Sequence, residues 1–233
     1  MLPHTFEATI QRAYTDTMSS FKKFSRIERY RKFVCPPALG GEPGFAIFYT
    51  PPEVKPTLVI IGQNPSNFAG NGAWTEEPNK TMLSGTIPAR NSYLQDRHYF
   101  AKSLGNLFRG HEHLLENAVG LNVWHFQASS DDARCAPKEL VRSCESTTRS
   151  LVAAMKPAAI LCFSRHAFYA LSKNRKGERV QGTNAEWLDI EDSRVWYVYH
   201  PTSSRTRLVS AHDAPIVLAE VESYLTNRRT PTS

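Results

Sequence analysis

The sequence predicts an α/β fold, a three-layer αβα sandwich around a central, mostly parallel four-stranded sheet. Two observations predict it. Four short apolar runs have the length of buried strands, and the segments between them carry apolar residues at helical spacing. Strands that alternate with helices form a mostly parallel sheet with helices on both faces. The 233 residues suffice for one core, so we expect a single domain over residues 1–233.

The four expected strands are apolar enough for a sheet that is covered on both faces. They are TLVIIG (57–62), NAVGLNVWHF (117–126), AAILCFS (158–164) and RVWYVYHPT (194–202). The run FAIFYT (45–50) could add an edge strand. The segment 177–192 reads as an exposed ribbon or loop because its residues are mostly polar.

Helices are expected at 92–108, 136–157, 166–173 and 214–228, where apolar residues recur at helical spacing. Residues 1–36 form a basic helical N-terminal arm, which ends at the proline- and glycine-rich segment 35–43. The positive side chains of this arm either form a solvated face or contact phosphates. They are Lys22, Lys23, Arg26, Arg29, Arg31 and Lys32.

The net charge of +6 favours polyanionic partners, with nucleic acid first among them. No apolar run approaches the roughly 20 residues of a membrane span, and no signal peptide is recognised. We therefore expect a cytoplasmic, nucleoid-associated monomer. The four cysteines form no C-x-x-C pair and fit no zinc motif, and Cys162 reads as a core thiol. An iron–sulfur cluster held by all four is the alternative to reduced thiols without a cofactor.

Several common catalytic motifs are absent from the sequence. No G-x-G-x-x-G follows the first expected strand, and no G-x-x-x-x-G-K-[ST] occurs, which argues against dinucleotide and nucleoside triphosphate sites. No G-x-S-x-G elbow appears either, which argues against a hydrolase triad.

Polar residues follow three of the four expected strands. The first strand leads into Gln63, Asn64 and Ser66, the second carries Asn122, and the fourth carries His200. Carboxyl ends of parallel strands share one edge, and α/β proteins bind ligands there. Alone, Asn64 could cap a turn before a proline, and His200 could be a structural histidine. Their joint placement at one edge favours a functional site.

This set resembles the uracil-DNA glycosylase superfamily over roughly residues 57–210. GQNPS (62–66) is similar to the first family motif, which reads GQDPY in the best-known branch and G-x-N-P in the asparagine-type branches. LNVWHF (121–126) resembles the strand whose asparagine reads uracil. HPTSSR (200–205) resembles the second motif in an atypical form. The resemblance implies a uracil-DNA glycosylase-like fold and a monofunctional N-glycosyl hydrolase that flips uracil out of DNA in base excision repair.

The resemblance also implies roles for the residues at this edge. His200 would donate a hydrogen bond to uracil O2 as negative charge develops there. Asn122 would accept from N3–H and donate to O4, a pattern that cytosine reverses. Asn64 would hold the attacking water, although an amide activates it less than a carboxylate does. Gln63 would contact the substrate beside them.

The remaining expected contacts concern the walls of the base pocket and the DNA backbone. Small Ser66 replaces a tyrosine and predicts tolerance of 5-substituted or other deaminated bases. Trp74, with Phe68 as the second choice, would stack on the flipped base. The residues expected to contact DNA are Ser203, Ser204, Arg205 and Arg207. Ser204 stands where the family inserts a leucine into the DNA, in the space that the flipped base leaves. Arg205 would fill this space instead, or the substrate would already be single-stranded.

Two alternatives to the DNA glycosylase stay open. One is a module of the same fold that binds DNA or a modified base without cleavage. The other is a hydrolase of free nucleosides or nucleotides, against which the arginine-rich segment SSRTR (203–207) argues.

Overall fold

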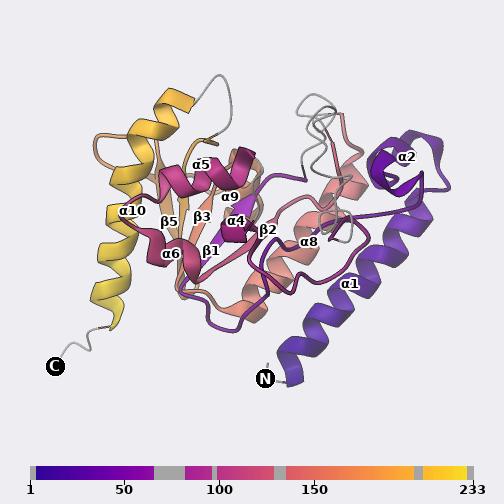
Figure 1. Ribbon diagram of the computed structural model, residues 1–233, viewed down its shortest axis with the longest axis horizontal. Coiled ribbons are helices and arrows are strands. Elements are labelled where there is room, and N and C mark those ends of the chain that lie inside the picture. Colours follow the sequence, from indigo (N-terminus) through magenta and orange to yellow (C-terminus); the bar gives the residue numbers. More distant parts are fainter. Residues whose placement is uncertain (1–3, 66–81, 96–98, 129–134, 202–206, 230–233) are drawn as a thin grey trace.

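A mixed six-stranded sheet, in the order β2-β1-β3-β6-β5-β4, forms the centre of the computed structural model (Figure 1). The structure describes residues 4–65, 82–95, 99–128, 135–201 and 207–229. Four strands are parallel, as expected: β1 (Leu58–Gly62), β2 (Ala118–Asn122), β3 (Ala159–Cys162) and β6 (Ser193–Tyr197). The α/β prediction is confirmed, whereas the prediction of a four-stranded sheet was wrong.

The two additional strands come from the segment that we expected to be a ribbon or loop. Strand β5 (Glu186–Ile190) pairs antiparallel with β6, and β4 (Glu178–Arg179) pairs antiparallel with β5. Ile190 faces Ser193 in the ladder, so only Glu191 and Asp192 form the turn. Glu191 has a positive φ of 51°, which tight two-residue hairpin turns require.

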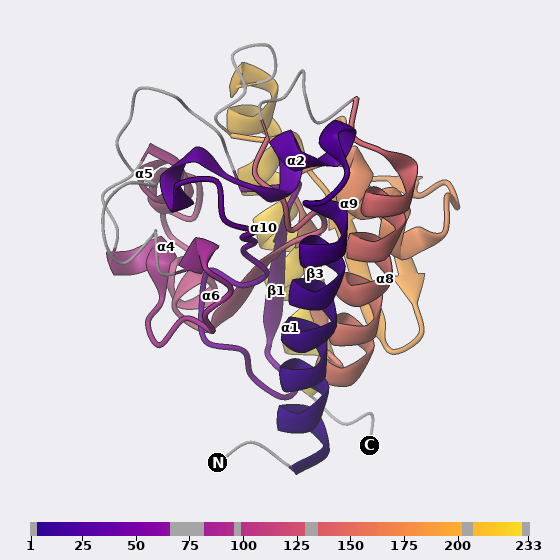
Figure 2. The ribbon, with the colours of Figure 1, turned by 90° about the vertical axis from the view of Figure 1, so that its right-hand side faces the viewer.

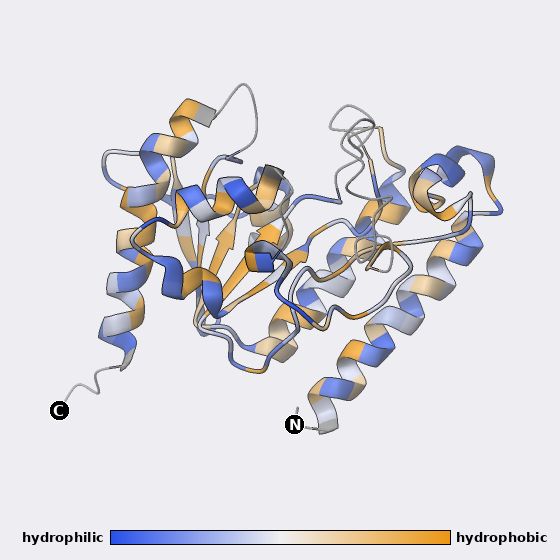
Figure 3. Cartoon of the chain, viewed as in Figure 1, coloured by the Kyte–Doolittle hydropathy of each residue, from blue (hydrophilic) through white to orange (hydrophobic). Residues whose placement is uncertain are grey.

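Helices cover both faces of the sheet, because successive strand residues point to opposite sides. Val59 and Ile61 belong to one buried cluster, which includes residues of α1 (His4–Phe24), α2 (Glu28–Val34), α8 (Lys138–Met155) and α9 (Arg165–Ser172). Leu58 and Ile60 belong to a second cluster, with residues of α4 (Ser92–Gln95), α5 (Tyr99–Leu107), α6 (Glu112–Glu116) and α10 (Arg207–Arg229). Figure 2 shows α1 and α8 side by side, and Figure 3 shows the apolar strands between the helices.

The N-terminal segment is part of the core rather than a separate arm. Phe6, Ile10, Tyr14 and Phe21 on α1 are buried in the first cluster, and α1 packs along α8. A short break after Phe24 separates α1 from α2, and the 3₁₀ helix η1 (Pro37–Leu39) follows. The apolar face of this segment is therefore structural, while its basic side chains remain exposed.

The other helix predictions hold with shifted ends. The expected helix 136–157 is α8, and 166–173 is α9. The expected helix 92–108 corresponds to α4 and α5, and residues 96–98 between them lie outside the described residues. Helix α10 starts at Arg207, earlier than expected, and continues through Pro215. Among the described residues, no helix combines the length and apolarity that crossing a membrane requires.

The run 45–50 lies beside β2 without becoming a strand. Phe48 forms one isolated bridge with Leu121, and Asn122 donates its backbone N–H to Ile47 O at 2.9 Å. The backbone N–H of Ala46 bonds His125 O at 3.0 Å, just past the end of β2. The segment therefore contacts the strand that carries the candidate site residue Asn122.

Candidate active site

The sheet register brings Asn122 and His200 to one face of the carboxyl edge. Gly62 pairs with Asn122, and the ladder continues with a bond from Phe163 N to Ile61 O and another from Val198 N to Cys162 O. Phe163 and Val198 belong to the cluster under α5, so side chains two residues apart along these strands share that face. His200 follows Val198 by two residues and contacts the Phe163 ring, with centroids 6.3 Å apart.

This edge is also the place where the strand order changes direction. From β1 the chain passes to β2 on one side and then to β3 on the other side. Ligands of open α/β sheets bind outside the carboxyl ends of the strands at such a switch point. Gly62 ends β1 and Asn122 ends β2, so both lie at this point.

The Asn122 side chain is held in one orientation by its neighbours. It is 1% exposed, and its Nδ2 donates to Tyr49 Oη at 3.0 Å and to Ala46 O at 3.4 Å. A methyl group on Gly62 would lie 3.0 Å from Asn122 Oδ1, so the amide oxygen faces this glycine. As placed, Asn122 offers a ligand an acceptor, and donation to a ligand would replace one of its two internal bonds. Gly62 was not among the expected site residues, although it begins GQNPS.

The backbone at Asn122 is fixed from helix α8. Thr148 Oγ1 donates to the backbone oxygen of Asn122 at 3.1 Å, and the backbone oxygen of Val123 is a second acceptor at 3.4 Å. The same hydroxyl lies 3.1 Å from His125 Nε2. Because the single hydroxyl proton points at these carbonyls, Nε2 carries the hydrogen and donates to Thr148. Burial lowers the pKa of His125 to about 3, so its ring is neutral. His125 Nδ1 has no partner among the described residues.

His200 lies between two phenylalanine rings. The Phe100 ring stacks on it with centroids 5.1 Å apart and 22° between the planes, and the Phe163 ring meets it edge-on. His200 is partly exposed, and its packing against these rings lowers the pKa of the imidazole to about 4. At neutral pH the imidazole is therefore uncharged, and one ring nitrogen carries a hydrogen that can be donated.

A row of aromatic rings connects the two candidate residues. Tyr49, which bonds Asn122, stacks on Tyr93 at 5.9 Å, and Tyr93 meets Phe100 edge-on at 5.9 Å. Gly120 permits this row, because a methyl group there would lie 2.3 Å from the Tyr93 ring. The tyrosines and Phe100 were not among the expected site residues. Their helical or apolar context indicated burial but not which side of the sheet they would cover.

Asn64 is also fixed through its amide nitrogen. Its Nδ2 donates to Ala128 O at 2.8 Å and to Pro65 O at 2.9 Å. Asn64 Oδ1 has no protein donor among the described residues, so it remains an acceptor. The turn after β1 is tied to the segment after β2, because Trp124 N donates to the backbone oxygen of Gln63 at 2.7 Å. Gln63 and Asn64 are both partly exposed.

Several expected site residues lie outside the described residues: Ser66, Phe68, Trp74, Ser203, Ser204 and Arg205. Arg207 is the first residue of α10. The proposed stacking, wedge and backbone contacts of these residues therefore stay predictions.

The cysteines lie in unlike surroundings. Cys144 and Cys162 are buried in the first core cluster, whereas Cys35 is partly exposed and Cys135 exposed, and all four are free thiols. Burial raises the pKa of Cys144 to about 12. Within the described part of the chain, which includes all four cysteines, no three His, Cys, Asp or Glu side chains gather in a metal-binding arrangement. Their placement does not support the alternative of a shared iron–sulfur cluster.

Comparison with known proteins adds no relative: no protein-family model matches the chain, and no curated protein matches it. The site is therefore interpreted from its own geometry and from the motifs that it carries.

Proposed function

We propose that the protein is a uracil-DNA glycosylase-like enzyme, which flips uracil out of DNA and hydrolyses its N-glycosidic bond. The observation that carries the proposal is the shared placement of the Asn122 amide and a neutral His200 on one face of the carboxyl edge. The ends of β2 and β6, which carry them, hold the motifs LNVWHF and HPTSSR, and the neighbouring end of β1 holds GQNPS. The four parallel strands are compatible with the fold that these motifs imply.

The proposed chemistry requires that negative charge on the departing base be stabilised. A neutral His200 donates its N–H to uracil O2 as that charge grows. Because the ring is uncharged, the site does not have to desolvate an imidazolium cation. Phe100 and Phe163 exclude water around this bond and so strengthen it. Phe100, which is partly exposed, is also available to contact the flipped base.

Base selection rests on Asn122. Its Oδ1 accepts a hydrogen bond from N3–H of uracil, whereas N3 of cytosine carries no hydrogen and would oppose one acceptor with another. The fixed Nδ2 makes this rejection effective, because an amide that could flip would serve either base. Hypoxanthine also presents a ring N–H, which agrees with the expected tolerance of other deaminated bases.

Asn64 is proposed to hold the attacking water through Oδ1, while its Nδ2 is held by two backbone carbonyls. An amide cannot take the proton of the water, so the reaction relies on leaving-group stabilisation more than on base catalysis. This same observation favours a second candidate, a module that binds DNA or a modified base without cleaving it. In either case we propose DNA as the partner, and a cytoplasmic, nucleoid-associated monomer.

The test is release of free uracil from single-stranded and double-stranded oligonucleotides, with uridine as a third substrate. Release from DNA, abolished in Asn122→Ala and His200→Ala, supports the enzyme. Tight binding of uracil-containing DNA without release supports the binding module. Release from uridine alone supports a nucleoside hydrolase and refutes the proposal. Circular dichroism of each variant establishes that it is folded.

A further inference from the structure

The positive charge of the protein is concentrated in one short segment. Residues 22–32 hold six lysines or arginines and one glutamate, and thus five of the six net positive charges of the chain. The rest of the chain is nearly neutral. All six basic side chains are exposed, whereas Phe24 and Tyr30 pack in the first core cluster and Ile27 is exposed as well. We call residues 22–32 the basic segment.

The basic segment lies at the carboxyl end of the sheet. Phe33, next to its last residue, is buried against Phe126 with ring centroids 5.7 Å apart, and Phe126 follows Asn122 by four residues. Val34 O accepts from Gly44 N, which joins α2 to the segment beside β2. In Figures 1 and 2, α2 and the start of α10, which follows β6, both lie in the upper part of the view, and Figure 1 shows them at opposite sides of the molecule.

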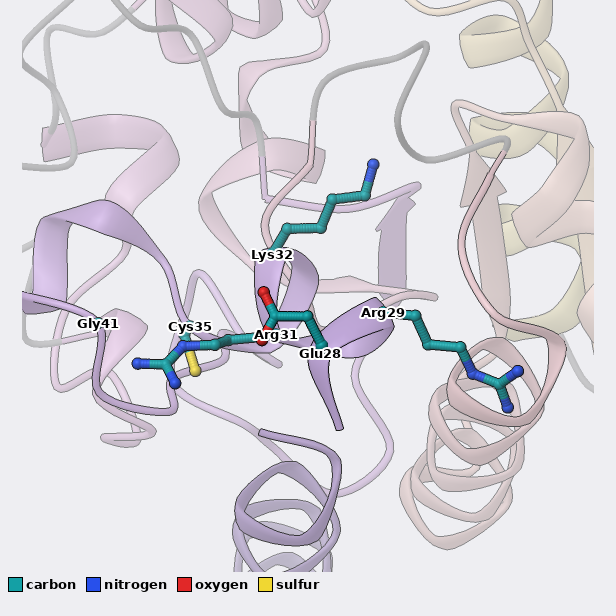
Figure 4. Close-up of a pocket in the computed structure, with 6 residues that line it drawn as sticks. All are labelled: Glu28, Arg29, Arg31, Lys32, Cys35 and Gly41. Atoms are coloured by element: carbon teal, nitrogen blue, oxygen red, sulfur yellow. The ribbon is translucent and has the colours of Figure 1, made fainter. Parts of the chain in front are cut away.

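Two neighbouring hollows open on this surface and share Arg29 and Lys32. One, of about 510 Å³, is also lined by Arg31, and the other, of about 390 Å³, by Lys138. Figure 4 shows Arg29 and Arg31 extending to opposite sides of Glu28, with Lys32 reaching outward between them. The cations therefore present their charges in several directions over a continuous surface.

The acidic residues of these hollows do not cancel the charge. The hollows are lined by four cations and two carboxylates, those of Glu28 and Glu139, and Glu139 accepts a hydrogen bond from Tyr30 Oη at 2.9 Å. Arg29 is partly pre-ordered: its guanidinium lies 5.0 Å from the Tyr30 ring centroid and donates to Tyr30 Oη at 3.3 Å. A guanidinium held in this way loses less freedom when it binds a phosphate.

We propose that the basic segment, with Lys138, binds the phosphodiester backbone of a DNA strand that extends beyond the base held at the carboxyl edge. The path of the DNA strand from the carboxyl edge rests on the proposed function. The location of the phosphate contacts rests on the distribution of charge. Arginine and lysine side chains on an exposed helix are the usual contacts to phosphate oxygens, and they position a strand without reading its sequence. The segment therefore supplies affinity, while Asn122 supplies the choice of base.

The test measures binding of a short, labelled single strand that contains no uracil, over a range of salt concentrations. The variant is Arg29→Gln/Arg31→Gln/Lys32→Gln. The matched control, Arg12→Gln/Lys176→Gln/Arg179→Gln, removes the same charge from exposed residues elsewhere. With about 0.7 ions released per phosphate contact on single strands, loss of three contacts lowers the slope of log K against log salt by about 2. The control should keep most of the original slope.

Equal slopes in the variant and its control would overturn the proposal, as would the absence of DNA binding by the unchanged protein. A variant that loses binding to phosphatidylserine vesicles but keeps its DNA affinity would reassign the segment to a membrane surface. Because uracil-free DNA and binding alone are used, the result does not depend on catalysis. Uracil release with unchanged binding by the variant would refute this site and leave the proposed function standing.

Discussion

Replacing Tyr49 by phenylalanine tests whether Asn122 is held by its neighbours as the structure describes. Tyr49 Oη accepts from Asn122 Nδ2 at 3.0 Å, and both residues are buried. The change keeps the ring and removes the acceptor, so one N–H of the Asn122 amide loses its partner and only the 3.4 Å bond to Ala46 O remains. An unsatisfied buried donor costs about 1–3 kcal/mol. For a chain of this length, 2 kcal/mol lowers Tm by about 4–8 °C.

The assay is thermal and urea unfolding of Tyr49→Phe in two backgrounds, the unchanged protein and Asn122→Ala. If the orphaned N–H of Asn122 causes the loss, the phenylalanine costs much less once that amide is gone, with a coupling of about 1–2 kcal/mol. Tyr224→Phe is the control, because the Tyr224 hydroxyl accepts from Arg228 on the surface and should contribute less than about 0.5 kcal/mol. Equal losses from Tyr49→Phe in both backgrounds would show that the Tyr49 hydroxyl does not stabilise the fold through Asn122.

The remaining predictions concern pH and the glycine beside Asn122. Because the pKa of His200 is lowered to about 4 and its neutral form acts, uracil release should stay level down to about pH 5; a fall that begins near pH 6.5 would contradict this. The unfolded chain protonates His125 below about pH 6.5, whereas the folded chain does so only near pH 3. His125 alone should therefore lower the stability by about 3 kcal/mol at pH 4 relative to pH 7, and urea unfolding of His125→Gln should lack that part of the pH dependence. Gly62→Ala should lower uracil release about tenfold, since its methyl group crowds Asn122 Oδ1 at 3.0 Å, a crowding equivalent to about 1.4 kcal/mol. Its control Gly105→Ala, with open space around the new methyl group in α5, should leave release unchanged and raise stability by about 0.5–1 kcal/mol.

The parallel part of the sheet was predictable because its strands must be apolar on both faces. The four residues from Leu58 to Ile61 are fully buried. A short, wholly apolar run between helical segments is typical of a parallel strand that is covered on both faces. Strand β5 was expected only as part of an exposed ribbon or loop and not as a strand of the central sheet. Its outer neighbour β4 has two residues, and its Asp189 is exposed, as on an edge strand. Edge strands are often charged, which hides them from a search for apolar runs.

The site was predictable where it depends on strand ends and was missed where it depends on packing. Parallel strands share a carboxyl edge, so the strand pattern places Asn122 and His200 at the same edge of the sheet. Tyr49 comes from a segment that forms only one bridge to β2, and Phe100 comes from a helix on one face of the sheet. Nothing local in either segment states which strand end it will cover, because long-range packing decides this.

The most direct test of the central claim is the release of free uracil from a single-stranded oligonucleotide by the unchanged protein and by Asn122→Ala. We expect release by the unchanged protein and none by a folded Asn122→Ala, because the amide oxygen beside Gly62 is proposed to select the base. Full activity in Asn122→Ala, or no release by the unchanged protein, would contradict it.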